Sequence, residues 1–381
     1  MLNKILFTTF LLCFTINNGY TEQKEATPLQ LIPPSLNNNI PQNYSITSKE
    51  KPEDKTTITK GNLQQSKKLA TELKKIKPLV YANSNNIIID TGYSNGLYNE
   101  VGNIICSLIN YMQKGKNINC DAKLSIGSIK NINDLRDAKA NLALVQAGFQ
   151  ENAFKGTKTF SKIGPFKKLR FVFSLYYESV ALIVRADSDI HTLDDVKGKI
   201  VDMGRKESAS NYITQTVITA KNWSQKSFKS TLSLSDDQKP EALCYGKVDA
   251  IFIASGNPNS IIKNITSLCE TSILNLDDQD IRKFVQNNKA FSMTTISGGL
   301  YLGSPKDINT FGEKATLVTT SDVSDSLIYE VTKLFFENLS NVKKIHRAFK
   351  PLNPMDMVED GKIAPIHNGA LIYYKEKGYI K

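Results

Sequence analysis

Residues 86–112 read NIIIDTGYSNGLYNEVGNIICSLINYM, and this stretch decides the class of fold. It opens on three consecutive isoleucines, Ile87–Ile89, a short apolar run typical of a strand buried on both faces of a parallel sheet. A loop with Gly92 and Gly96 follows. Apolar side chains then recur at helical spacing, at Val101, Ile104, Ile105, Leu108, Ile109 and Met112. A strand, a glycine-containing loop and an amphipathic helix together predict a βα unit.

The same alternation continues along the chain. It predicts further strands over 122–126, 142–145, 171–173, 180–184, 200–203, 248–253 and 315–319. It predicts helices over 129–138, 193–198, 210–221 and 325–338. Such alternation indicates an α/β fold with parallel sheets. With 381 residues, 40% of them hydrophobic, the chain is long enough to bury one large core or two medium ones.

The first 21 residues are predicted to be a secretory signal peptide. Lys4 supplies the positive charge, residues 5–16 the apolar segment and residues 19–21 a cleavage site. A membrane span needs about 20 apolar residues, so this segment is short for an anchor. Two outcomes stay open, a cleaved signal and an uncleaved N-terminal anchor. Cys13 follows Leu12, where a lipoprotein needs a small residue, and we therefore do not predict a lipoprotein.

Residues 22–85 differ from the rest of the chain in composition. They are rich in Lys, Gln, Asn, Thr, Ser, Glu and Pro and poor in aromatic residues. Such a segment buries too little apolar surface to offset the entropy of ordering it, so we predict a disordered linker. It is either an inert extension or, with an uncut signal, a tether.

Charge and motif content exclude several classes of function. The formal net charge is +11, but the Lys and Arg residues are scattered, so we expect a solvated surface and no nucleic-acid partner. The three histidines form no HExxH motif, and the glycine-containing segments lack the GxxxxGK[ST] pattern of a phosphate-binding loop. No Cys/His cluster suits a metal. We therefore expect no enzymatic activity, no cofactor and no metal site.

Four cysteines remain after loss of the signal, namely Cys106, Cys120, Cys244 and Cys269. Four cysteines allow three pairings, and disulfides are typical of exported proteins. We favour the two sequence-local disulfides, Cys106–Cys120 and Cys244–Cys269, because each closes a short loop between a helix and the next strand. By loop-closure entropy the first should stabilise the fold by about 3 kcal/mol.

Residues 364–378, APIHNGALIYYKEKG, form a turn containing Pro and Gly and then a short helix ending on Gly378. The pattern resembles the closing motif (AP-h-H-x-GA-x-x-YY-x-E-x-G) of the TAXI group, the solute-binding subunits of tripartite ATP-independent periplasmic (TRAP) transporters. His367 belongs to this motif, and we interpret it as structural. Asn368 stands where the family usually has Pro, and Ile372 where an Arg often precedes the tyrosines.

Other segments resemble the same family in order along residues 86–381. Residues 90–98 resemble its first loop, GTGGTxGVYY, and residues 142–148 resemble a strand ending in a Gln that faces the cleft. Further resemblances cover 120–135 (to CSVESTGGSVYNLNAL), 190–201 (to IKSFDDLKGKRV), 244–258 (to DALCxGKIDAFFFxxGHPN) and 310–318 (to TVGxKATLV).

The chain also departs from the family pattern near the expected ligand. Tyr93 replaces a Gly and Asn99 replaces a second Tyr in the first loop, while Asn257 replaces a His. Residues 204–211, GRKESASN, stand where the family has a glycine-rich loop, GxPGSGT/R. That loop should help to hold the ligand, so the identity of the ligand does not transfer.

The resemblance implies a two-lobed periplasmic-binding-protein (type II-like) fold with a ligand cleft between the lobes. We expect lobe 1 over 86–178, lobe 2 over 179–295, and a return to lobe 1 with the C-terminal helices over 296–381. It implies a monomeric periplasmic protein that captures a small anionic solute, a carboxylate such as glutamate, glutamine, a 2-oxo acid or a dicarboxylic acid. The partner would be a TRAP membrane permease driven by an ion gradient. The alternative is an exported interaction protein that keeps the two lobes but has lost transport.

Candidate ligand contacts lie where strands run into helices, because α/β sheets bind ligands beyond the carboxyl ends of their strands. Backbone N–H groups at a helix N-terminus favour an anion, and Ser, Asn, Tyr and Gln side chains add neutral hydrogen bonds. The predicted set is Gly92, Ser94, Asn95, Gly96, Tyr98, Ser125, Ser128, Asn131, Gln146, Gly204, Ser208 and Ser210.

Some of these residues have a structural alternative. In this alternative, Ser94, Asn95 or Ser128 would cap a helix instead of contacting a ligand, and Tyr98 would lie in the core instead of the cleft. Arg205, on the loop of the second lobe, is a candidate clamp because a guanidinium matches the geometry of a carboxylate.

Overall fold

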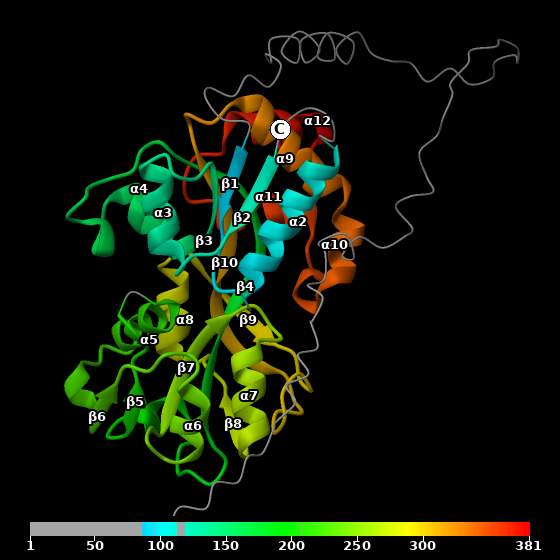
Figure 1. Ribbon diagram of the computed structural model, residues 1–381. Helices are drawn as coiled ribbons and strands as arrows, with labels where there is room; N and C mark the ends of the chain where they lie inside the picture. The colour runs from blue at the N-terminus through cyan, green and yellow to red at the C-terminus, as the bar shows by residue number, and fades with distance from the viewer. Residues whose placement is uncertain (1–85, 95, 113–118, 207) are drawn as a thin grey trace, which may run out of the picture. The chain divides into compact units, whose positions relative to one another are not determined.

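The computed structural model describes residues 86–94, 96–112, 119–206 and 208–381. The predicted signal peptide (1–21), the predicted linker (22–85) and Asn95 lie outside the described residues. Within the described part, strands and helices alternate as the sequence indicates, and the predicted α/β class is confirmed (Figure 1).

The described strands form one ten-stranded sheet in the order β2-β1-β3-β10-β4-β7-β5-β6, with β8 paired to β4 and β9 paired to β10. One half of the sheet contains β1 (Asn86–Asp90), β2 (Asn119–Lys123) and β3 (Leu142–Gln146). The other half contains β5 (Ile200–Asp202), β6 (Ser230–Leu232), β7 (Ala250–Ser255), β8 (Thr271–Leu274) and β9 (Phe291–Ile296). β1 runs parallel to β2 and β3, and β5 runs parallel to β6 and β7.

Two long strands run through both halves of the sheet, β4 (Leu169–Arg185) and β10 (Ile308–Thr320). From residue 179 onward β4 pairs with β7, and its last residues also pair with β8. The first half of β10 pairs with β9 and its second half with β3, and the two long strands pair antiparallel with each other. The molecule is therefore two-lobed, with lobe 1 around β1–β3 and lobe 2 around β5–β9. The expected limits 86–178, 179–295 and 296–381 stay a prediction, because both long strands belong to each lobe.

Helices cover both faces of the sheet in lobe 1 (Figure 1). One face packs against α2 (Leu97–Met112), α9 (Asp325–Glu337), α10 (Leu339–Ile345), η6 (Arg347–Phe349), α11 (Pro354–Glu359) and α12 (Asn368–Lys377). The other face packs against α3 (Ser128–Arg136), α4 (Ala147–Lys155) and η3 (Lys158–Phe160). Coverage on both faces explains why β3 is apolar at four successive positions before Gln146.

Lobe 2 has the same layered construction. Its helices are η4 (Leu193–Val196), α5 (Ala209–Ala220), η5 (Gln225–Ser227), α6 (Lys239–Cys244), α7 (Ser260–Leu268) and α8 (Gln279–Gln286). Along β4, Val180, Leu182 and Val184 pack toward α5 and α8, whereas Ala181 and Ile183 pack toward α6 and α7. This alternation is the two-residue period of a strand buried on both sides.

Several strand predictions were wrong in their limits, among them 315–319, which is the second half of β10 (Ile308–Thr320). The separate strands predicted over 171–173 and 180–184 are one strand, because the polar residues between them are extended as well. The strand predicted over 122–126 is β2 (Asn119–Lys123) and ends before Leu124. Leu124 and Ile126 are exposed loop residues, so their hydrophobicity does not report on a buried strand.

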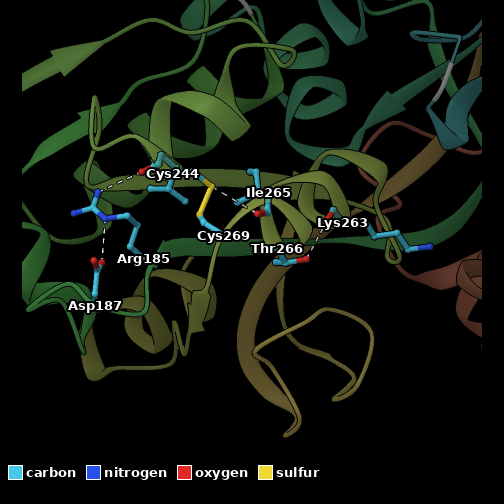
Figure 2. Close-up of a disulfide and its surroundings, with 8 residues drawn as sticks. Arg185, Asp187, Cys244, Lys263, Ile265, Thr266 and Cys269 are labelled. Carbon is cyan, nitrogen blue, oxygen red and sulfur yellow. Dashed lines mark hydrogen bonds and ion pairs between the residues drawn. A yellow bond between two sulfur atoms is a disulfide. The ribbon is translucent and has the colours of Figure 1, made fainter.

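Both sequence-local disulfides are present. Cys106 of α2 is bonded to Cys120 of β2 in lobe 1. In lobe 2, Cys244 at the end of α6 is bonded to Cys269, the residue that follows α7 (Figure 2). Each lobe therefore carries one covalent cross-link between neighbouring elements.

The C-terminal motif docks α12 onto lobe 1. His367 is the N-cap of α12: its Nδ1 accepts a hydrogen bond from the backbone N–H of Gly369, and its Nε2 lies 3.0 Å from the carbonyl oxygen of Val323. Burial holds the pKa of His367 below its usual range, so the ring is neutral and donates from Nε2. The hydroxyl of Tyr374 donates to the carbonyl oxygen of Val172 on β4. The structural interpretation of His367 is confirmed. In the part of the chain described, no helix is both long enough and apolar enough to cross a membrane.

Candidate functional site

A cavity of about 170 Å3 lies beside β4 where this strand passes from lobe 1 to lobe 2, and residues of both lobes line it. Lobe 1 contributes the loop before α2, the start of α3 and the end of β3. Lobe 2 contributes the start of α5, the loop after β6, and the end of β7 with the loop that follows it. Pockets for drug-sized ligands usually enclose about 300–1,000 Å3, so the closed cavity suits a small molecule.

Seven of the predicted site residues line this cavity, namely Gly92, Gly96, Tyr98, Ser128, Gln146, Ser208 and Ser210. They come together because each lies at the end of a strand, in the loop that follows it or at the start of the next helix, at the edge where the parallel strands of its lobe end. Ser128 is the first residue of α3, and Gly127 holds the N-cap position that was the alternative for Ser128. The Ser128 hydroxyl accepts a hydrogen bond from the backbone N–H of Gln146.

A buried carboxyl group, Glu178, forms part of the wall of the cavity. It lies on β4 and accepts a hydrogen bond of 2.5 Å from Nε2 of Gln146. The hydroxyl of Tyr98 is buried close enough to influence the Glu178 carboxyl, but it makes no hydrogen bond of regular geometry in the described structure. Burial raises the pKa of Glu178 to about 7, and the nearby Tyr98 and Gln146 side chains lower it in part.

A second buried carboxyl group lies opposite Glu178 on the neighbouring strand. Glu313 of β10 is the cross-strand partner of Glu178, and its Oε2 accepts a hydrogen bond of 2.6 Å from the backbone N–H of Gly148. Its Oε1 is buried without a hydrogen-bond partner in the described residues. Burial holds the pKa of Glu313 well above its usual range, and the charge of Glu178 raises it further. Burial therefore favours the protonated form of Glu313.

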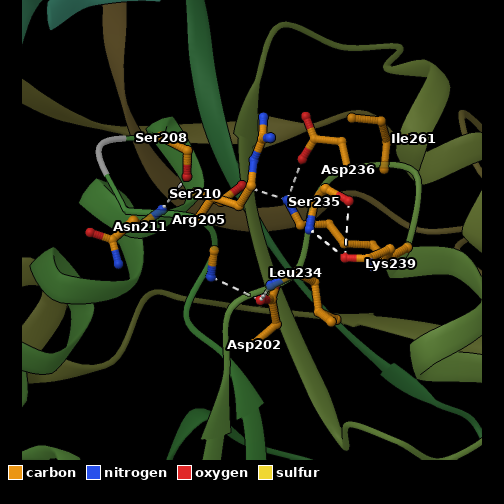
Figure 3. A network of polar contacts seen from close by, with 12 residues as sticks. Asp202, Arg205, Ser208, Ser210, Asn211, Leu234, Ser235, Asp236, Lys239 and Ile261 are labelled. Carbon is orange, nitrogen blue, oxygen red and sulfur yellow. Dashed lines mark hydrogen bonds and ion pairs between the residues drawn. The ribbon is translucent and has the colours of Figure 1, made fainter. Parts of the chain in front are cut away.

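The wall from lobe 2 is a polar network (Figure 3). Ser208 is the N-cap of α5, and its hydroxyl accepts from the backbone N–H of Asn211. Ser210 lies in the first turn of α5, and its hydroxyl accepts from Nζ of the buried Lys239 at 2.8 Å. The same ammonium group donates to Asp236, which also lines the cavity. The network leaves the Ser210 hydroxyl proton free to donate to a ligand.

One hydrogen bond joins the two lobes across the cavity. Nη2 of Arg205 in lobe 2 donates to the hydroxyl of Tyr93 in lobe 1, at 3.1 Å. Both residues line the cavity. Tyr93 is the residue that replaces a glycine of the family's first loop, so this departure from the pattern creates the contact.

Four predicted residues lie outside the cavity. Asn131 is fully buried, and its Nδ2 donates to the carbonyl oxygens of Thr91 and Leu144 while its Oδ1 accepts from Ser125. Ser125 thus supports the loop after β2. Ser94 is exposed and does not line the cavity.

Gly204 is the fourth of these residues, and it shapes the turn before α5. Its φ is +69°, and a Cβ there would lie 2.6 Å from the backbone nitrogen of Asn211. Its N–H donates to the buried Asp202, whose carboxyl also accepts from the N–H of Leu234 (Figure 3). Gly204 and Asp202 therefore position the loop rather than touch a ligand.

The sequence interpretation missed several cavity residues, above all Glu178, Tyr176 and Ser255. The hydroxyl of Ser255 is buried and has no hydrogen-bond partner in the described part of the chain. Glu178 was detectable, because it is the one acidic residue within the run LRFVFSLYYESVALIVR. A lone carboxyl group in an otherwise apolar strand is costly to bury and therefore indicates a function.

A second cavity, of about 710 Å3, lies on the other face of β4. Tyr177 and Ser179 line it, whereas Glu178 between them lines the first cavity. Successive side chains of a strand point to opposite faces, which explains the division. None of the predicted site residues lies in the second cavity. Among the described residues, no cluster of three or more His, Cys, Asp or Glu side chains is arranged to hold a metal ion.

A comparison with protein families identifies the family of this chain. The profile of the NMT1-like family matches residues 89–378. The chain belongs to the NMT1-like family. The match includes every element of both lobes from the last residues of β1 to the end of α12.

Solved structures with a similar fold have low sequence identity to this NMT1-like protein. XAC2383 from Xanthomonas citri bound to ATP is 9% identical, with a TM-score of 0.48, covering 78% of this chain and 100% of that one. The periplasmic aliphatic sulphonate binding protein SsuA from Escherichia coli is 11% identical, with a TM-score of 0.43, covering 78% and 80%. A binding protein component of an ABC phosphonate transporter from Pseudomonas aeruginosa is 15% identical, with a TM-score of 0.44, covering 69% and 78%.

Proposed function

We propose that this protein is an extracytoplasmic solute-binding protein that captures a small carboxylate between its two lobes. The observation that carries the proposal is the cavity beside β4, which both lobes line and which the Arg205–Tyr93 hydrogen bond spans. The helix N-terminus at Ser208, the unpartnered Ser255 hydroxyl and the Gln146 amide supply the few convergent polar groups of a small-molecule site. Membership of the NMT1-like family supports the same class.

The mechanism is binding with closure and involves no bond chemistry. In the open form the lobes separate about β4 and β10, and the solute enters between them. A solute that contacts both lobes favours the closed form by the difference between its affinities for the two forms. Such hinge motions take place in μs to ms.

The charges of the cavity favour one kind of carboxylate over another. Arg205 places a positive charge in the wall of the cavity that lobe 2 contributes, whereas Glu178 is a buried carboxyl group in the wall of the same cavity. A dicarboxylate or 2-oxo acid brings only negative charge to Glu178, whereas an amino acid brings an ammonium group that satisfies it. We therefore propose an amino acid as the solute.

The finer proposal is that the protein is a TAXI-type subunit that delivers its solute to a TRAP permease driven by an ion gradient. It rests on the resemblance of residues 364–378 and of the other segments to that group. Export to the periplasm by the predicted signal peptide is part of this proposal, and so is a monomeric state.

Thermal unfolding of the purified protein against the standard amino acids, 2-oxo acids and dicarboxylates tests the proposal. A solute at about 100 times its dissociation constant adds about 2.7 kcal/mol to the free energy of unfolding. A selective shift is expected, with amino acids as the active class. A flat response from folded protein would contradict solute binding and favour the interaction protein that has lost transport.

A pair of variants tests the site itself. Gln146→Ala removes the hydrogen bond to Glu178 inside the cavity and should weaken binding about tenfold or more, since a hydrogen bond to a charged group contributes about 1.5–3 kcal/mol. Ser94→Ala is the matched control, because Ser94 was also predicted to contact the ligand but lies outside the cavity. Equal effects of the two variants would reject the cavity as the binding site.

A further inference from the structure

Glu178 is buried without a cationic partner. Its side chain lines the cavity, and the residue is 7% exposed. In the described structure its hydrogen-bond partner is the neutral amide of Gln146, and no Lys, Arg or His forms an ion pair with it. An ionised carboxylate in such a place loses hydration that a single neutral amide does not fully replace.

The other groups around Glu178 do not supply a positive charge either. Tyr98 of α2 and Tyr176 of β4 are buried phenols beside it, and Glu313 faces it from β10 as a second carboxyl group. From lobe 2, Arg205 and Asp236 line the same cavity. Arg205 donates to Tyr93, and Asp236 is paired with Lys239, so each already has its own partner.

Glu178 is therefore a group whose charge depends on what occupies the cavity. We propose that Glu178 holds a proton while the cavity is empty and releases it when a cationic group of the solute binds beside it, so that solute capture is linked to proton release. The inference rests on the proposed function, in that it requires the cleft to bind a solute. In this step the O–H bond of the Glu178 carboxyl breaks, the proton passes to the solvent, and the carboxylate pairs with the cation.

Burial raises the pKa of Glu178 to about 7, and this sets the expected amount of proton release. The site without solute then carries most of a proton at pH 6 and little of one at pH 8. A cation that lowers the pKa of Glu178 by two units or more releases most of that amount. A solute with only negative charge has the opposite effect, because it raises the pKa of Glu178 and causes proton uptake that grows from pH 6 to pH 8.

Titration calorimetry with L-glutamine, in two buffers of different ionisation enthalpy at pH 6, 7 and 8, measures the proton count per bound solute. We expect release of most of a proton per solute at pH 6 and of little at pH 8. Glu178→Gln should bind without proton exchange. Asp90→Asn is the matched control, because burial also raises the pKa of Asp90 to about 7 but Asp90 does not line the cavity. This control should keep the full proton release.

Carboxyl 13C NMR of the empty protein, with labelled glutamate, tests the first half of the inference without any solute. The resonance that disappears in Glu178→Gln should titrate near pH 7. A midpoint near 4.3, the ordinary value for glutamate, would overturn the inference. Binding heat without proton exchange would overturn the linkage and leave the proposed function intact. A Glu178 midpoint near 7 with no binding heat would instead count against an amine-bearing solute, and hence against the proposed function.

Discussion

Glu178 on β4 and Glu313 on β10 are direct cross-strand partners, on the two strands that belong to both lobes. Opposite residues of an antiparallel pair point to the same face of a sheet, so two carboxyl groups share one buried space at the junction of the lobes. Glu178 lines the cavity, and Glu313 contacts the start of α4. The two residues differ in what they touch and should respond differently to substitution.

Glu313→Gln should leave the free energy of unfolding at pH 7 nearly unchanged. Burial raises the pKa of Glu313 and so disfavours its charged form, and a glutamine still accepts from Gly148 without a buried charge. Glu313→Leu leaves that N–H without an acceptor and should lower the free energy of unfolding by about 1–3 kcal/mol. Urea unfolding of both variants measures the difference, and equal losses would argue that Glu313 is ionised.

Gly148→Ala should hold the lobes apart. A Cβ at this position would lie 2.1 Å from the hydroxyl oxygen of Tyr212 in lobe 2 and 2.8 Å from Oε2 of Glu313. We expect weaker solute binding and a larger radius of gyration with solute present. Adding Tyr212→Phe removes the closest of these atoms and should restore part of the affinity. If the double variant closed no better than Gly148→Ala, Tyr212 would not be the obstacle.

Tyr93→Phe should speed the release of solute by a few fold. It removes the hydroxyl that accepts from Arg205 across the cavity, and a single exposed hydrogen bond contributes about 0.5–1.5 kcal/mol. Stopped-flow dissociation measures the rate. Tyr111→Phe serves as the control, because Tyr111 is an exposed tyrosine of α2 outside the cavity and should release solute at the unmodified rate.

The free energy of unfolding should fall as the pH rises from about 4 to about 7. Burial raises the pKa of Asp90 and of Glu178 to about 7, with the neighbouring Asp134 adding to the shift of Asp90. In this range these two carboxyl groups bind more protons in the folded protein than in the unfolded chain, where Asp and Glu titrate near pH 4, so their contribution favours unfolding as the pH rises. The lowered pKa values of His346 and His367 act in the opposite direction, so the contribution of Asp90 is read from the difference between the parent protein and Asp90→Asn. Thermal unfolding between pH 4 and pH 8 should show the decline, and Asp90→Asn should make it shallower. A melting temperature that rose through this range would contradict the sign.

Each disulfide should stabilise its own lobe by a similar amount. The cross-links span 14 and 25 residues, which corresponds to about 3 and about 3.5 kcal/mol of loop-closure entropy. Replacing one pair of cysteines by serines should lower the free energy of unfolding by that amount, measured in urea without reductant. A reductant should then have no further effect on a variant that lacks both pairs.

The alternation of strands and helices was enough to predict the α/β class, because apolar periodicity reports burial directly. It was insufficient at β4, where Tyr176 to Ser179 interrupt the apolar run. These residues are polar because they face the two cavities. A strand that lines a site therefore lacks the continuous apolar sequence of a core strand. Ile126 shows the reverse error. It was predicted to lie in a strand because it is apolar, but it lies beyond the end of β2 and lines the cavity.

The candidate site was predictable only in part, for a related reason. Gln146 and Ser208 follow from strand-end and helix-start positions, which sequence shows. Asn131 also has a polar side chain near the start of a helix, yet the backbone carbonyl groups of Thr91 and Leu144 already accept from its amide. Only the three-dimensional arrangement reveals which polar side chains are already satisfied. The broader family is shown by the match over residues 89–378, while the TRAP partner stays a prediction.

The position of β10 between β3 and β4 also decides when this protein can acquire its structure. A chain that ends before residue 308 lacks β10, the strand that pairs with both β3 and β4 in lobe 1. Lobe 1 therefore stays incomplete until most of the polypeptide has been synthesised, and pairings between such distant segments form slowly. Late folding of this kind fits the export of the chain that is part of the proposed function.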